Sequence, residues 1–119
     1  MASRISAVRA WASIPSRREI RADAAATAGT AVKAVADGTV VFADWMTGYG
    51  NILIIDHGNG YMSLYAHNDG LLRDAGDAVK RGDPVASVGT SGGQARPALY
   101  FELRRNGAPV NPGSWLSRQ

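Results

Sequence analysis

The two histidines, His57 and His67, are the side chains best suited to bind a metal ion or transfer a proton. A hydrolytic zinc site needs three nitrogen or oxygen ligands and an open position for water. The chain contains no cysteine, no His-Glu-x-x-His motif and no His-x-His motif. His57 stands in a predicted turn, which favours a structural role, whereas His67 ends a predicted strand and could reach a functional surface. Two such isolated residues do not by themselves predict a metal site.

Nucleophilic and phosphate-binding sites are not predicted either. Ser91 lies in Thr90-Ser91-Gly92-Gly93, without the Gly-x-Ser-x-Gly frame of many serine hydrolases. The glycine-rich run 89–93 is followed by no lysine and opens no predicted helix, so it does not match a phosphate-binding loop. We predict that residues 90–94 form a flexible loop.

Charge is distributed unevenly along the 119 residues, whose net charge is +3. Residues 1–21 carry five arginines and one glutamate, and the remaining 98 residues carry eight basic and nine acidic side chains. Nucleic-acid binding needs basic residues clustered on a folded surface, so we predict no nucleic-acid partner. No run approaches the roughly 18 apolar residues of a membrane span, and the N-terminus does not resemble a signal peptide.

Short apolar runs separated by glycine-containing turns must position these side chains. Predicted strands cover residues 31–36, 39–45, 51–56, 61–66, 85–88 and 99–104. The connections through residue 66 are only a few residues long, which favours antiparallel pairing, because parallel neighbours need crossovers of about a dozen residues. No segment of helical length shows a 3.6-residue period. The sequence therefore predicts an all-β fold, an antiparallel sheet or sandwich with short hairpins.

A series of motifs follows these turns and strands in a fixed order. It includes Ala36-Asp37-Gly38-Thr39, Gly48-Tyr49-Gly50-Asn51, Leu64-Tyr65-Ala66-His67, Gly76-Asp77-Ala78-Val79, Leu99-Tyr100-Phe101-Glu102 and Val110-Asn111-Pro112. This order resembles the LytM (lysostaphin-type) domain of peptidoglycan-cleaving zinc endopeptidases, over about residues 17–116. The resemblance implies the duplicated-hybrid-motif fold of that family. We predict a flexible lead-in over residues 1–16 and a single degenerate LytM-like domain over residues 17–119.

The metal-binding motifs of the family are altered here. Its active members carry His-x-x-x-Asp before the first strand, Tyr-x-His on a central strand and His-Leu-His-Phe-Glu on the last strand. The resemblance places Glu19 and Asp23 at the first pair, and the last motif reads Ala98-Leu99-Tyr100-Phe101-Glu102. Alanine cannot bind a metal, and a neutral phenol is a poor zinc ligand. The resemblance therefore implies a domain without a tightly held zinc, without another cofactor and without hydrolytic activity.

The closest resemblance is to the degenerate LytM domains of EnvC-type murein hydrolase activators. It rests on Asp44-Trp45, Tyr61-Met62-Ser63-Leu64-Tyr65, Ser91-Gly92-Gly93-Gln94 and Leu99-Tyr100-Phe101-Glu102. It implies a periplasmic division factor that activates an N-acetylmuramoyl-L-alanine amidase by docking through the vestigial groove. Relatives of this type usually carry a signal peptide and a coiled coil upstream, so we expect a C-terminal fragment or a shortened relative.

The groove residues are predicted from the same resemblance and from strand alternation. Tyr100, Glu102 and Arg104 alternate onto one face of the last strand. The expected partner-binding set is Tyr49, Tyr65, His67, Tyr100, Glu102, Arg104 and Arg21. Replacement of Tyr100 or Arg104 with alanine is expected to abolish amidase stimulation and leave the fold intact. Trp45 and Trp115 are assigned to structural packing.

Three other functions stay open at this point. The first is an active zinc endopeptidase whose ligands lie elsewhere. The second is a biotinyl or lipoyl carrier, because the corner 76–82 resembles a hammerhead. A carrier displays its lysine at a hairpin tip, however, whereas Lys33 lies within a predicted strand and Lys80 within the corner. The third is a peptidoglycan-binding module without an amidase partner, which would hold a stem peptide through tyrosine stacking and Arg104.

Overall fold

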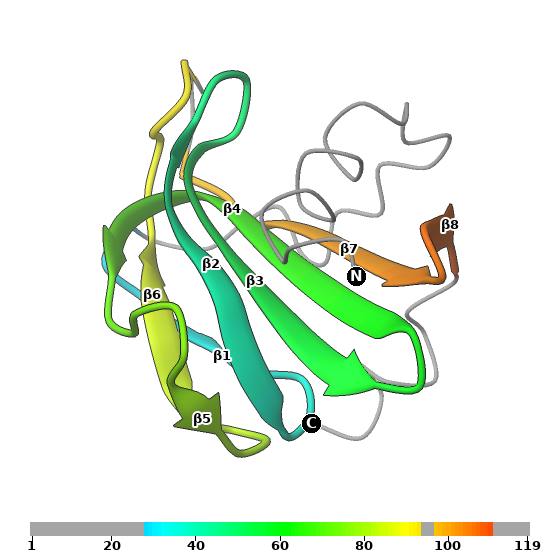
Figure 1. The fold of residues 1–119 in the computed structure, drawn as a ribbon. Coiled ribbons are helices and arrows are strands. Elements are labelled where there is room, and N and C mark those ends of the chain that lie inside the picture. The colour runs from blue at the N-terminus through cyan, green and yellow to red at the C-terminus, as the bar shows by residue number, and fades with distance from the viewer. Residues whose placement is uncertain (1–27, 94–96, 111–119) are drawn as a thin grey trace.

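Strands make up all the regular structure of the described residues. The computed structural model describes residues 28–93 and 97–110, and these form strands without a helix (Figure 1). The strands are β1 Ala31–Lys33, β2 Gly38–Met46, β3 Gly50–Gly58, β4 Tyr61–Leu71, β5 Ala78–Val79, β6 Pro84–Val88, β7 Tyr100–Arg105 and β8 Ala108–Pro109. The predicted all-β class is confirmed. The lead-in predicted for residues 1–16 lies outside the described residues.

The sheet is antiparallel throughout and is organised around β4. The strand order is β1-β6-β4-β3-β2-β5, and β7 pairs with β4 and with β8. The first part of β4 lies between β3 and β7, whereas residues 68–71 pair with β6. Figure 1 shows β2, β3 and β4 running side by side, with β7 next to β4. The long strand β4 thus connects the β2–β3 hairpin to β7.

The turns follow the residue types that the sequence places there. Asn59-Gly60 joins β3 to β4 with φ angles of 54° and 81°, and Asn106-Gly107 joins β7 to β8 with 51° and 83°. Two successive positive φ angles are typical of the hairpin turns that favour Asn-Gly. Two predicted boundaries were wrong: the first strand ends at Lys33 instead of residue 36, and β4 continues to Leu71.

Two clusters of buried apolar side chains lie on opposite faces of the sheet. In β3, Leu53 and Ile55 belong to the first cluster, whereas Ile52 and Ile54 belong to the second. Alternating side chains point to opposite faces of a strand. The unbroken apolar run 52–55 therefore reflects a strand that is buried on both faces.

A chain of hydrogen bonds crosses the sheet from His57. Its Nδ1 lies 2.8 Å from the Asp37 carbonyl oxygen, and its Nε2 lies 2.6 Å from Ser63 Oγ. Ser63 Oγ lies 2.8 Å from the Tyr65 hydroxyl, which also accepts the Val35 N–H at 3.1 Å. A carbonyl only accepts, so Nδ1 carries the hydrogen that is shared with Asp37. His57 lies within β3 and not in the predicted turn, and its hydrogen bonds connect Asp37 to Ser63.

Stability is expected to fall as the pH decreases from 7.5 to 5.5. Burial lowers the pKa of His57, an effect that the nearby Asp56 and Asp37 only partly oppose. Below the unfolded value of about 6.5, the unfolded chain binds more protons than the folded chain. Urea unfolding at several pH values measures this loss. The His57→Gln variant is expected to show a flatter profile, and identical profiles for the two proteins would contradict the assignment.

Candidate functional site

Three side chains of β7 are connected on one face, as strand alternation predicted. The Tyr100 hydroxyl donates to Glu102 Oε2 at 2.7 Å. Arg104 contacts Glu102 Oε1 through Nε at 3.0 Å and through a terminal nitrogen at 2.8 Å. Glu102 and Arg104 are buried, with 3% and 0% of their surface exposed, whereas Tyr100 is half-buried. The buried ion pair therefore holds the phenol and leaves its ring as the outer part of this row.

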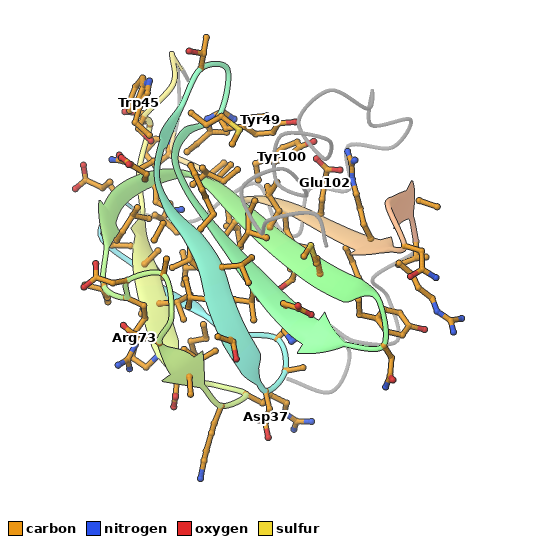
Figure 2. All side chains as sticks on the ribbon, in the orientation of Figure 1. Asp37, Trp45, Tyr49, Arg73, Tyr100 and Glu102 are labelled. Atoms are coloured by element: carbon orange, nitrogen blue, oxygen red, sulfur yellow. The ribbon has the colours of Figure 1, made fainter. Side chains whose placement is uncertain are left out.

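Tyr100 is the centre of a group of three rings, which we call the aromatic platform (Tyr49, His67 and Tyr100). The Tyr100 ring lies 6.0 Å from that of Tyr49 and 5.8 Å from that of His67, both edge-on. Tyr49 comes from the loop between β2 and β3, and Figure 2 shows it next to Tyr100 and Glu102. Edge-on aromatic contacts at such distances are favourable. Three segments distant in the sequence thus meet at one surface.

An irregularity in β4 brings His67 to this surface. Asn51 pairs with Asn68 and Leu53 pairs with Tyr65, so Ala66 and His67 together face the single residue Ile52. His67 also has a φ angle of 62°. An extra residue of this kind is a β-bulge, which locally changes the face to which side chains point. The bulge therefore places His67 against Tyr100, on the opposite side from Tyr65.

The prediction that Tyr65 rims the groove is wrong. Tyr65 is completely buried in the first apolar cluster, with its ring 5.4 Å from Phe101. Burial raises its pKa to about 12. Regular alternation would place Tyr65 and His67 on the same face, but the bulge between Asn51 and Leu53 separates them.

The other predicted site residues differ in how far their side chains are exposed. Tyr49 and Tyr100 are half-buried, and His67 keeps 7% of its surface exposed. Arg104 is completely buried and is paired with Glu102, so it does not line the groove directly as predicted. Glu19, Arg21 and Asp23 lie outside the described residues, as does Trp115. The prediction that Trp45 serves structural packing is wrong, because its side chain is 56% exposed and lies away from Tyr49 (Figure 2).

The platform is polar but carries no negative charge from Tyr49 near neutral pH. Burial raises the pKa of Tyr49, and the carboxylate of Glu102 raises it further. Arg104 partly opposes this effect. Since an ordinary phenol already has a pKa near 10, Tyr49 remains protonated. The platform is suited to stacking and hydrogen bonding.

The described residues do not fit the zinc ion that the LytM fold implies. Ala98 has no donor atom, and the Tyr100 hydroxyl donates its hydrogen to Glu102. His67 Nδ1 is bound to the Ser91 carbonyl oxygen at 2.8 Å. Within residues 28–93 and 97–110 there is no group of three His, Cys, Asp or Glu side chains that could hold a metal. His67, which matches the Tyr-x-His motif of the family, therefore lies beside the Tyr100 phenol and not beside further metal ligands within the described residues.

Ser91 is a residue of the site that the sequence did not identify. Its Oγ accepts the Asn51 N–H at 3.0 Å and donates to the Asn68 carbonyl at 2.5 Å. The predicted flexible loop is thus bonded to both β3 and β4. The glycines at positions 50 and 92 were the available signal, because glycines in neighbouring turns permit close backbone approach.

The described part of the chain has no helix of the length and apolar character that crossing a membrane requires. Ordered β-strands account for its regular structure.

Two proteins of known name share much of this sequence. Murein hydrolase activator EnvC of Escherichia coli is 55% identical over 93 residues, which are 78% of this chain and 22% of EnvC. Murein hydrolase activator NlpD of the same organism is 42% identical over 98 residues, or 82% of this chain and 26% of NlpD. The chain thus spans about a quarter or less of these relatives.

A solved structure shares the fold. The catalytic domain of lysostaphin from Staphylococcus simulans superimposes with a TM-score of 0.71 at 28% identity, covering 77% of this chain and 74% of that domain. Residues 20–112 match peptidase family M23. The chain therefore contains a LytM-type domain and belongs to peptidase family M23.

Proposed function

We propose that this domain activates a murein hydrolase, specifically an N-acetylmuramoyl-L-alanine amidase, and does not itself cut peptidoglycan. The observation that carries the proposal is the environment of Tyr100. At the position of a family zinc ligand, this phenol is hydrogen-bonded to a buried carboxylate and forms the centre of the aromatic platform. The similarity to two proteins named murein hydrolase activators supports the same interpretation.

The platform has the chemistry of a protein-docking surface. Tyrosine is frequent among residues that dominate interface energies, especially where its ring is held in place. Tyr100 is held by Glu102 and by its two ring neighbours, so little conformational freedom is lost when a partner covers it. We propose that the amidase binds here, in the periplasm, during the splitting of the septal wall at division.

An assay on dye-labelled murein tests the proposal. A purified N-acetylmuramoyl-L-alanine amidase from the organism that produces this protein is incubated with the murein, with and without the 119-residue chain. We expect faster dye release when the chain is added. We expect no peptide release by the chain alone, even with added zinc, because Ala98 and Tyr100 replace nitrogen donors. An unchanged amidase rate would contradict activation.

Two further arms separate the remaining functions. Peptide release by the chain alone, together with stoichiometric zinc in the purified protein, would identify an active endopeptidase. Co-sedimentation with intact murein without any effect on the amidase would identify a peptidoglycan-binding module.

A further inference from the structure

The loop at residues 89–93 is bonded to the two segments that carry Tyr49 and His67. Ser91 Oγ accepts the Asn51 N–H at 3.0 Å and donates to the Asn68 carbonyl at 2.5 Å. The Ser91 carbonyl oxygen accepts from His67 Nδ1 at 2.8 Å. A single residue therefore connects the start of β3, the bulge of β4 and the imidazole of the platform.

The backbones of the loop and the hairpin are in direct contact at the same place. A Cβ atom at Gly92 would lie 2.6 Å from the Gly50 nitrogen, and these residues have φ angles of 77° and 71°. The Tyr49 carbonyl in turn accepts the His67 N–H at 2.8 Å. Such positions admit glycine and exclude larger residues. The loop therefore fits against the hairpin in one register.

We propose that Ser91 is the positioning residue of the aromatic platform. Its hydroxyl bridges β3 and β4 next to Tyr49 and His67, and its carbonyl oxygen fixes the orientation of the imidazole. Because a carbonyl oxygen only accepts, the hydrogen of neutral His67 resides on Nδ1 and leaves Nε2 as an acceptor. This inference rests on the proposed docking function, since it assigns the residue that keeps the docking surface in shape.

The Ser91→Ala variant of the whole chain tests the inference with two structural measurements. Nitrogen–proton correlation spectra of the His67 ring report its tautomer, and hydrogen exchange reports the protection of the Asn51 amide. We expect the Nδ1–H tautomer in the unmodified chain and a mixture of tautomers in the variant. Exchange of the Asn51 amide is expected to become about tenfold faster, since its acceptor is lost.

Ser87 provides a matched control. Its Oγ accepts the Gly70 N–H at 3.0 Å, which is the same kind of bond between β6 and β4. Ser87→Ala is expected to leave the His67 tautomer unchanged. Ser91→Thr keeps a hydroxyl at the position and is expected to restore both the tautomer and Asn51 protection. Thermal unfolding of each variant establishes that the domain is folded.

Amidase stimulation completes the test. We expect Ser91→Ala to weaken stimulation about tenfold at limiting concentrations, and Ser87→Ala to leave it unchanged. An unchanged His67 tautomer in folded Ser91→Ala would overturn the inference. Normal stimulation by a variant with altered tautomer would also overturn it. Absence of stimulation by the unmodified chain would instead reject the proposed function, and the tautomer would still decide whether Ser91 positions the platform.

Discussion

Replacement of Tyr100 with alanine is expected to weaken amidase stimulation about 30-fold, the loss that corresponds to about 2 kcal/mol at an interface hot spot. The variant loses both ring contacts of the platform, to Tyr49 and to His67. The measurement is the concentration of the chain that gives half-maximal amidase rate on dye-labelled murein. Tyr100→Phe keeps the ring but removes the donor to Glu102, so we expect an intermediate loss.

Tyr61→Ala is the matched control for this prediction. Tyr61 is also half-buried and lies on β4, but it stacks under Arg105 at 5.2 Å, far along the strand from His67. We expect this variant to stimulate the amidase normally. Equal losses in Tyr61→Ala and Tyr100→Ala would indicate a general effect on the fold and would reject the platform as the docking surface.

Replacement of Arg104 with methionine is expected to destabilise the domain by about 3–5 kcal/mol, the usual cost of removing one partner of a buried ion pair. The variant would leave the Glu102 carboxyl group with 3% exposure and without the guanidinium that lies 2.8 Å away. Domains of this size are stable by about 5–15 kcal/mol, so the loss is a large fraction of the total. This expectation replaces the one drawn from the sequence, in which removal of Arg104 left the fold intact.

Urea unfolding of three variants measures the effect. Arg104→Met is expected to unfold at the lowest concentration. The double variant Glu102→Gln/Arg104→Met is expected to recover part of the loss, because no unpaired charge stays buried. Equal stability of Arg104→Met and the double variant would show that the charge of Glu102 is not the cause.

The fold was predictable to a large extent because its signals are local. Asn59-Gly60 and Asn106-Gly107 are dipeptides that favour hairpin turns, and both join neighbouring antiparallel strands in the structure. The apolar run 52–55 predicted a strand, and β3 contains it. The first strand was predicted too long, since the apolar residues after Lys33 contribute to the core without continuing the strand.

The site was only partly predictable, because its geometry depends on contacts between distant segments. Alternation along β7 correctly placed Tyr100, Glu102 and Arg104 on one face, since a single strand determines that relation. The same rule failed for Tyr65 and His67, which a bulge separates. The glycines at positions 50 and 92 indicated that two backbones could approach closely, but not that Ser91 would bond to residues on β3 and β4.

The amino-acid sequence by itself determined which chemical groups stand at positions 98 and 100: a methyl group and a phenol, whatever the fold around them. The tertiary structure decided which side chains share a surface, namely Tyr49, His67 and Tyr100. It also decided that Arg104 lies inside, where it supports Tyr100 through Glu102. The physical reason is that side-chain identity is a property of each residue. The burial of a side chain and the sheet face to which it points depend on strand pairing and on a bulge that forms only when the strands meet.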